Sequence, residues 1–404
     1  MGLTYDPHDP QNLIDGVPFA LLARIRRDEP ICPTPSGALY LSRRSDVEVV
    51  LKDVDTFHAD LGPMTGLAGV EVIPADQWFL SEIPEPRHGR IRRLFNASFG
   101  PHRTRAMTEF VTVTCNGLVD DMLTKTLPDL HEDYAMPIPS LVMAEVLGLP
   151  SDISRSFMDW SFDGSLIERP ASPGVVPGGP AVQAYFTEQL ALQRSLSEPT
   201  NHVFSLFMET EIEGEPLSDQ EIVTELHFMI QAGVHTTRGL LIHVVQRLLE
   251  SAELFNSLQN DRTLIIPFVE ETLRHDSPVQ RVTRRCMRPT TVGGTEMKGG
   301  EWLEVGIASA NRDEEAYADP EEFRLDRQDP RDHLAFGGGS HVCPGATLAR
   351  MEAVIAVGVL LDRLDSMSTV EGVRYPPIPG SLSHAPVPAV LVPAGRRRES
   401  DSSP

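Results

Sequence analysis

Long apolar runs, cysteine and basic residues are all scarce in this chain of 404 residues. No stretch of about 18 consecutive apolar residues occurs, and the first ten residues are mostly polar, so the sequence predicts no membrane anchor. The four cysteines, at positions 32, 115, 286 and 343, have neither metal-site nor disulfide spacing, which is typical of a reducing compartment. We therefore expect a cytoplasmic protein.

Acidic residues outnumber basic ones, with 58 Asp and Glu against 35 Lys and Arg, which gives a net charge of −23. Such a surplus of negative charge argues against nucleic acid or an anionic membrane as a partner. The segment 86–108 is the exception, because it holds six arginines and no acidic residue. We expect part of it to face the functional site and the rest, around Arg90, Arg93 and Arg103, to dock an acidic protein partner. A solvated helix face is the alternative.

Hydrophobic residues make up 41 % of the chain, which is enough for a large core. Length alone favours two or more domains. The motifs described below, however, spread from residue 88 to residue 345 and must converge on one site. We therefore expect a single domain over 1–395, followed by a disordered tail over 396–404.

Cys343 lies in the most informative segment of the chain. Residues 336–345 read Phe-Gly-Gly-Gly-Ser-His-Val-Cys-Pro-Gly. Glycines let a backbone pass close to a flat cofactor, and the N-terminus of a helix expected over 346–362 would stabilise a thiolate. Pro344 has no N–H, so the donors left for the sulfur are those of the next two residues. Taken alone, the segment could also be a glycine-rich loop with a buried free cysteine.

This segment resembles the haem-binding signature of the cytochrome P450 family, Phe-Gly-x-Gly-x-His-x-Cys-x-Gly, at every fixed position. The resemblance implies that Cys343 is the axial thiolate ligand of the iron of haem b. It also implies that Phe336 packs near the sulfur, that His341 contacts a haem propionate and that Gly345 lies against the cofactor.

A second segment, Glu271-Thr-Leu-Arg274, lies in a helix expected over 261–275. Its Glu and Arg are three residues apart and so share one helix face. Most such pairs are solvated surface charges. The resemblance instead implies a buried structural clamp, without a catalytic role.

A third segment, residues 232–237 (Ala-Gly-Val-His-Thr-Thr), lies in a long helix expected over about 219–250. Thr236 can bond back to the carbonyl of Ala232, which favours a local kink and a groove for O₂. The family has an acidic residue where this chain has His235. The resemblance implies that Thr236 organises proton delivery to O₂. We expect His235 to join this relay, with a packing or substrate-contact role as the alternative.

The resemblance to the same family also implies the remaining site residues, from their positions relative to the motifs above. His88, Arg92 and Arg284 are expected to bind the haem propionates together with the histidine of the cysteine segment. The substrate pocket is expected to be apolar and roofed by residues 58–86, and 168–180 is either a moving loop or a surface connector. The wall residues of the substrate pocket are expected to be Phe228, Gln231, Ala232, Val279 and Val282.

The fold implied is mainly α-helical with a smaller β region. Helices are expected over 18–29, 44–53 and most of 88–165, and strands near 31–32, 38–41 and 290–307. The implied reaction inserts one oxygen atom from O₂ into a hydrophobic small molecule, by hydroxylation or epoxidation. Electrons would come from NAD(P)H through a ferredoxin or flavodoxin and its reductase. The alternatives are a peroxide-driven, desaturating or coupling enzyme, and a haem-thiolate protein that binds or senses a ligand without turnover.

Overall fold

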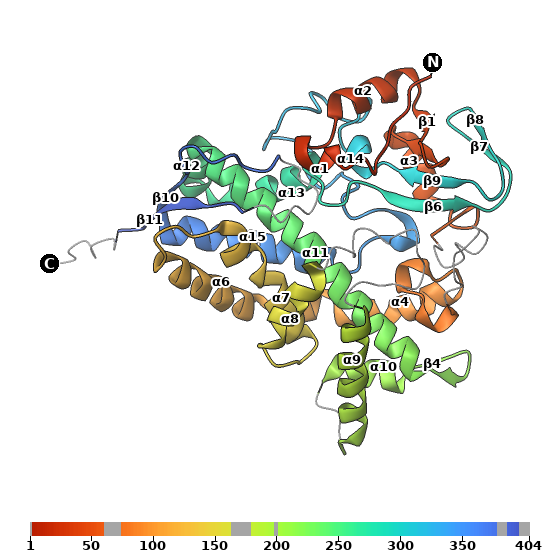
Figure 1. Ribbon diagram of the computed structural model, residues 1–404, viewed down its shortest axis with the longest axis horizontal. Coiled ribbons are helices and arrows are strands. Elements are labelled where there is room, and N and C mark those ends of the chain that lie inside the picture. Colours follow the sequence, from red (N-terminus) through yellow and green to blue (C-terminus); the bar gives the residue numbers. More distant parts are fainter. Residues whose placement is uncertain (1, 60–73, 163–178, 198–200, 378–385, 396–404) are drawn as a thin grey trace.

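The computed structural model describes residues 2–59, 74–162, 179–197, 201–377 and 386–395 (Figure 1). Its longest element is α11 (Asp219–Glu250), which crosses the middle of the molecule. The helix begins as its sequence predicts, because the Ser218 hydroxyl accepts the Glu221 N–H at 3.2 Å and the Glu221 carboxylate accepts the Ser218 N–H at 2.9 Å.

Helices make up most of the described chain. The shorter ones before α11 are α1 (Gln11–Asp15), α2 (Phe19–Asp28), α3 (Arg44–Lys52), α4 (Arg87–Ser98), α5 (Pro101–Ala106), α6 (Thr108–Leu123), α7 (Pro137–Val146), α8 (Ile153–Phe162), α9 (Gly179–Ser195) and α10 (His202–Glu209). Those after it are α12 (Ala252–Asn260), α13 (Ile265–His275), α14 (Ile307–Ala310) and α15 (Ala346–Arg363). Single turns are η1 (Ala75–Gln77), η2 (Leu80–Glu82), η3 (His131–Ala135), η4 (Arg262–Leu264) and η5 (Gly339–His341).

The main sheet has five strands in the order β1-β2-β9-β6-β3, and only the β2–β9 pair is parallel. Its strands are β1 (Ile31–Pro33), β2 (Leu39–Leu41), β3 (Phe57–His58), β6 (Val282–Cys286) and β9 (Trp302–Val305). Three two-stranded sheets pair β4 (Glu211–Ile212) with β5 (Glu215–Pro216), β7 (Thr290–Val292) with β8 (Thr295–Met297), and β10 (Leu364–Thr369) with β11 (Ala389–Pro393).

One helix boundary and one strand differ from the sequence prediction. The helix expected from 261 begins only at Ile265, because the Asp261 carboxylate caps the separate turn η4 by accepting the Thr263 N–H at 3.0 Å. Strand β6, which carries Arg284, was not predicted at all. It forms because it pairs with β9, a long-range contact that local propensity does not report.

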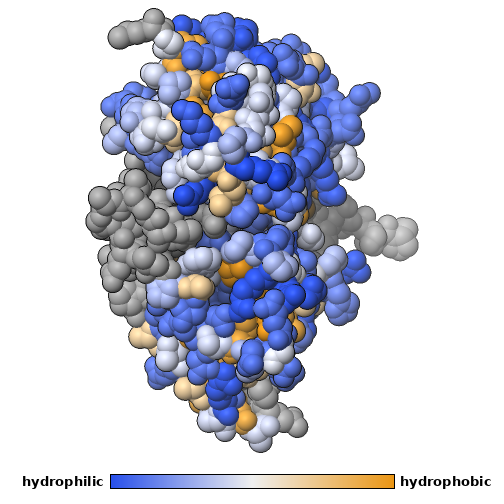
Figure 2. All heavy atoms as spheres, turned by 90° about the vertical axis from the view of Figure 1, so that its right-hand side faces the viewer, coloured by the Kyte–Doolittle hydropathy of each residue, from blue (hydrophilic) through white to orange (hydrophobic). Residues whose placement is uncertain are grey.

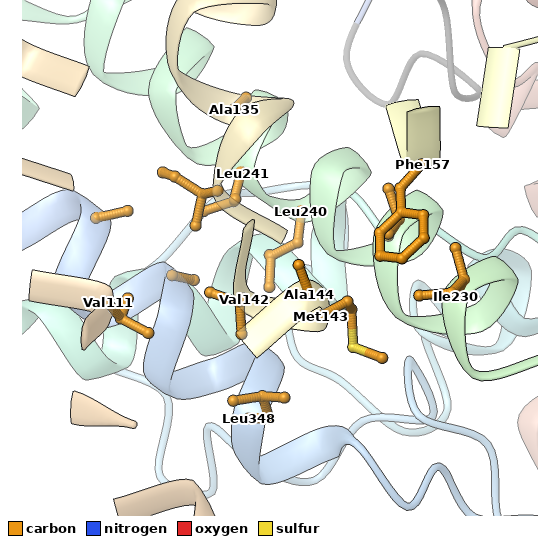
Figure 3. Close-up of a cluster of buried hydrophobic side chains, with 14 of the residues drawn as sticks. Val111, Ala135, Val142, Met143, Ala144, Phe157, Ile230, Leu240, Leu241 and Leu348 are labelled. Carbon is orange, nitrogen blue, oxygen red and sulfur yellow. The ribbon is translucent and has the colours of Figure 1, made fainter. Parts of the chain in front are cut away.

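The largest hydrophobic core surrounds α11 and draws on α6, α7 and α15. Figure 3 shows three of its side chains, Met143, Leu240 and Leu348, which come from α7, α11 and α15 respectively. Full burial of a side chain of this size is worth about 1.5–3 kcal/mol. A second core packs the main sheet against α3 and α14. The site described next lies between these helices and the sheet.

The face shown in Figure 2 is mainly hydrophilic, with apolar residues in small separate areas. Among the helices of the described residues, none combines the length and apolarity needed to cross a bilayer. Most of the predicted loop 168–180, part of the expected roof 58–86 (residues 60–73) and the predicted tail 396–404 lie outside the described residues.

Candidate functional site

A cavity of about 330 Å³ lies between α11 on one side and α15 with the cysteine segment on the other. Most of the residues that the sequence singles out border it: His88, Arg92, Phe228, Ala232, Thr236, Val279, Val282, Arg284, Phe336, His341, Cys343 and Gly345. Gln231 and His235, which were expected there too, are not among its lining residues. Residues from distant parts of the sequence therefore meet at one site, as a single domain requires.

The cysteine segment is held in a tight conformation. Gly337 and Gly339 have φ angles of +73° and +65°, a region that residues with side chains avoid. At Gly339 a side-chain carbon would also lie 2.3 Å from the Leu51 carbonyl oxygen. The Cys343 N–H donates to the Phe336 carbonyl at 2.9 Å, which closes the loop.

Two opposing effects act on the Cys343 thiol. Burial raises its pKa, whereas hydrogen bonds from the N–H groups of Gly345 and Ala346 and the nearby cations of Arg92 and Arg350 lower it. Helix α15 begins at Ala346, so the sulfur also lies at a helix N-terminus. Burial outweighs the other effects and the pKa of the thiol is raised, so a thiolate here would need a positive partner on the cavity side.

Cationic side chains gather on one side of the cavity. The rings of His88 and His341 stack with centres 4.0 Å apart, beside Arg92 and Arg284. Burial lowers the pKa of Arg284 to about 10, and burial together with His88, Arg284 and Arg92 lowers the pKa of His341 to about 3. Crowded basic groups therefore resist carrying all their charge without an anion.

Two buried nitrogens of this cluster, His88 Nε2 and Arg284 Nε, have no hydrogen-bond partner among the described residues. The other ring nitrogen of His88 is 2.8 Å from the Glu85 carboxylate, so the unpartnered one is left for a ligand. Arg92 donates to the Val342 carbonyl, which ties α4 to the cysteine segment. Unpartnered buried nitrogens, clustered basic side chains and a cysteine facing an apolar cavity fit a flat, apolar group with anionic arms and a metal, as haem is.

Helix α11 supplies the opposite wall through Ala232, Gly233 and Thr236. The Thr236 hydroxyl donates to the Ala232 carbonyl at 2.8 Å, as the sequence predicts, and α11 continues through this point as one helix. His235 is buried, with Nδ1 3.3 Å from an Arg238 guanidinium nitrogen. His235 does not border the cavity as Thr236 does, because a residue one place before Thr236 points about 100° away around a helix.

The Glu271–Arg274 pair is buried and lies next to the cavity region rather than on its wall. Arg274 donates to the Glu271 carboxylate at 2.7 and 2.8 Å and also to the carbonyl groups of Asn311 and Pro320. Arg327 adds a second cation to Glu271 at 2.9 Å. Breaking such a buried pair typically costs about 3–5 kcal/mol, which suits a structural clamp.

Sequence reasoning missed several residues of the site. Met143, Leu240 and Ile307 line the cavity, although each reads as an ordinary core residue in the sequence, whereas Leu80 falls within the expected roof 58–86. Arg327 was not predicted as a partner of Glu271, because the two residues are 56 positions apart in the sequence. Only the folded chain brings these groups together.

Comparison with known proteins agrees with this geometry. The sequence profile described as Cytochrome P450 matches residues 183–391. The chain is 31 % identical over 323 residues to a steroid C26-monooxygenase of Mycolicibacterium smegmatis, which covers 78 % of this chain and 80 % of that protein. It is 33 % identical over 286 residues to cytochrome P450 107B1 of Saccharopolyspora erythraea, covering 70 % of this chain and 69 % of the relative.

Solved structures extend the likeness over nearly the whole chain. Cytochrome P450 CYP109Q5 from Chondromyces apiculatus has a TM-score of 0.82 at 29 % identity, covering 97 % of this chain and 99 % of its own. CYP109E1 from Bacillus megaterium in complex with testosterone has a TM-score of 0.82 at 27 % identity, covering 94 % and 98 %. On sequence, fold and the arrangement of its cavity, the chain belongs to the cytochrome P450 family of haem-dependent monooxygenases.

Proposed function

We propose that this protein inserts one oxygen atom from O₂ into a hydrophobic small molecule, with Cys343 as the protein ligand of the haem iron. The observation that carries the proposal is the position of Cys343 on the cavity wall, with the cation cluster beside it and an apolar wall opposite. The haem, when bound, supplies the activation of O₂ and the oxygen transfer. The residues of the chain supply binding, orientation and proton control.

Four side chains would hold the two propionates of the haem: His88, Arg92, Arg284 and His341. Charge-assisted hydrogen bonds from Arg to a carboxylate are among the strongest in proteins. The unpartnered Arg284 Nε supports this assignment because it would gain an acceptor, and so would His88 Nε2 when a nearby carboxylate holds the ring in its protonated form. Phe336, Ala232 and Gly345 would contact the faces of the ring.

Thr236 would organise the proton supply from α11. Its hydroxyl donates to the Ala232 carbonyl, which leaves its oxygen lone pairs free to accept a hydrogen bond from a water or from a reacting group. The residue borders the cavity on the side opposite Cys343. His235 does not border the cavity and its ring lies beside Arg238, which favours the packing alternative over a part in the relay.

The substrate is proposed to be an apolar molecule of steroid or polyketide size. The part of the wall formed by Leu80, Phe228, Met229, Val279 and Val282 is apolar. The similarity to a steroid C26-monooxygenase and to a structure that contains testosterone supports this class. A macrolide is equally compatible, since a structure of EryK with erythromycin B also matches, with a TM-score of 0.82.

The electron donor is proposed to be an acidic ferredoxin or flavodoxin that docks near α4 and α5. Arg93 and Arg103 are exposed there. Arg90 was expected to contribute as well, but its guanidinium pairs with Glu213, at the tip of the β4–β5 hairpin, so part of its charge is already neutralised. Docking would therefore depend more on Arg93 and Arg103 than on Arg90.

One observation favours a second reaction, in which hydrogen peroxide replaces O₂ and the electron donor. The position that is acidic in the family holds His235, and that ring faces Arg238 rather than the cavity. Turnover with hydrogen peroxide that equals turnover with a reductase system would favour this alternative.

The decisive experiment is the absorption spectrum of the reduced protein under carbon monoxide. Sulfur-ligated haem gives a Soret band shifted far to the red, and we expect this band for the natural protein and its loss in Cys343→His, which offers nitrogen instead. A natural protein without the far-red band would show that Cys343 does not ligate the iron. If the far-red band is present, a screen of steroids and macrolides for shifts in the Soret band would identify the substrate class.

A further inference from the structure

Glu270 precedes the clamp residue Glu271 on α13, and its buried carboxylate has a different set of partners. It accepts hydrogen bonds from Arg350 Nε at 2.8 and 3.0 Å, one for each oxygen. Arg331 Nε lies 3.0 Å away, and so does His333 Nε2. The two carboxylates thus face different segments, because Glu271 binds Arg274 and Arg327 instead.

Two partners of Glu270 lie on either side of the cysteine segment in the sequence. His333 comes three residues before Phe336, and Arg350 lies on the first turns of α15, seven residues after Cys343. The guanidinium carbon of Arg350 lies 4.4 Å from the centre of the Phe336 ring, and the His333 ring centre is 6.2 Å from it. Cation–π contact of this kind is worth about 0.5–2 kcal/mol.

The hydrogen bonds of His333 show which of the side chains around Glu270 carry a charge. His333 Nδ1 accepts the Ala335 N–H at 3.3 Å, so the ring proton is on Nε2 and is donated to Glu270. His333 is therefore neutral. The Arg331 side chain is 69 % exposed and that of Arg350 only 23 %, so Arg350 is the main counterion of the buried carboxylate.

We propose that Glu270 is a positioning residue that keeps the Cys343 loop in its ligating conformation, by holding Arg350 against Phe336 and His333 against the start of the loop. The inference rests on the proposed function, because it concerns a loop whose task is to present a thiolate. The contact path is short: Glu270 binds Arg350, Arg350 covers Phe336, and the Phe336 carbonyl accepts the Cys343 N–H at 2.9 Å. Without the carboxylate, the Arg350 cation loses its anchor and the aromatic cover over the loop loosens.

If Glu270 only stabilised the fold, removal of any other buried ion pair at this end of α13 would have the same effect on the protein. Asp276, one residue past the helix, provides the matched control, since it is buried and binds Arg247 at 2.6 and 2.9 Å. The Asp276 carboxylate also contacts His275 and Arg312, which do not belong to the cysteine segment. Asp276→Asn should therefore lower the stability of the fold without loosening the loop.

The experiment compares haem-loaded natural protein with Glu270→Gln, Arg350→Met, the double variant and Asp276→Asn. The reduced carbon monoxide complex of each is followed over time at 25 °C, and the rate at which the far-red Soret band is lost is measured. Urea unfolding midpoints and amide hydrogen exchange over 333–345 are recorded on the same samples. These readouts do not depend on turnover.

We expect Glu270→Gln to lose the far-red band about tenfold faster than the natural protein, and Asp276→Asn to stay within about twofold. The double variant should be no faster than Glu270→Gln, since removal of both partners leaves no unpaired buried charge. Exchange over 333–345 should rise in Glu270→Gln and in Arg350→Met but not in Asp276→Asn. Equal rates for Glu270→Gln and Asp276→Asn, or an additive double variant, would overturn the proposal. Absence of the far-red band from the natural protein would instead refute the proposed function.

Discussion

Gly233 and Met143 touch across the crossing of α11 and α7, so closely that a side-chain carbon on Gly233 would lie 2.7 Å from the Met143 sulfur. Both residues line the cavity, and Met143 is buried. The glycine at this position therefore has a packing role. It lets a large side chain from α7 reach the wall of the site.

Gly233→Ala tests this contact. Alanine is the better helix former by about 1 kcal/mol, yet overpacking of a core typically costs about 1–3 kcal/mol, so we expect a net loss of stability. Urea unfolding of the haem-loaded protein measures it. Adding Met143→Val, which shortens the opposing side chain, should recover part of the loss. A more stable Gly233→Ala single variant would show that Met143 moves aside freely.

Thr236→Val keeps the shape of the side chain and removes its hydroxyl. If Thr236 organises protons, electrons should still be consumed but less substrate should be oxidised, with product per NAD(P)H reduced by about tenfold or more. Product formation and NAD(P)H consumption are measured together. Thr236→Ser, which keeps the hydroxyl, is the control and should stay near the natural ratio. An unchanged ratio in Thr236→Val would remove Thr236 from the proton supply.

His235→Ala separates the two possible roles of this histidine. Because its ring faces Arg238 and does not border the cavity, we expect product per NAD(P)H to stay within about twofold of the natural protein. The solvent isotope effect on turnover should be unchanged for the same reason. A large change in either quantity would place His235 in the relay, as the family pattern suggests, through a path that runs by way of Arg238.

Glu225→Gln should change how stability depends on pH. The buried Glu225 carboxyl accepts the Leu80 N–H at 3.1 Å, and burial raises its pKa well above the ordinary value. The folded state thus holds this proton more tightly than the unfolded state, so the stabilisation is complete below about pH 4.5 and is lost as pH rises. The uncharged amide avoids that loss.

Urea unfolding at pH 5, 6.5 and 8 measures the difference between Glu225→Gln and the natural protein. The advantage of the variant should grow by about 1.4 kcal/mol per pH unit until the natural carboxyl ionises. The Leu80 N–H keeps an acceptor in the variant, so the cavity wall at Leu80 should be preserved. A constant difference across this range would contradict a raised pKa.

Arg93→Glu and Arg90→Glu compare an exposed arginine with one that already has a partner. We expect Arg93→Glu to slow electron transfer from an acidic ferredoxin about tenfold at low salt, and Arg90→Glu to have a smaller effect because Arg90 pairs with Glu213. Stopped-flow reduction at two ionic strengths measures both. High salt should reduce the difference, since exposed charges are screened. Equal rates for both variants and the natural protein would favour a solvated helix face.

The sequence by itself determined the features that depend on close spacing. The capping box at Ser218 and Glu221 set the start of α11, and the bond from Thr236 to the Ala232 carbonyl followed from residues four apart. The cysteine segment could be recognised because its glycines, aromatic and cysteine occur at fixed short offsets. Such features involve neighbours in the chain, so local chemistry is enough to predict them.

Only the tertiary structure decided which distant residues meet. Glu270 and Arg350 are 80 residues apart, and Gly233 and Met143 are 90 apart, so no local pattern joins them. The face of α11 that borders the cavity was likewise decided by packing, which places Thr236 on the cavity wall and leaves His235 off it. The physical reason is that burial and ion pairing between distant segments depend on how the helices dock, and a sequence read along its length does not contain that geometry.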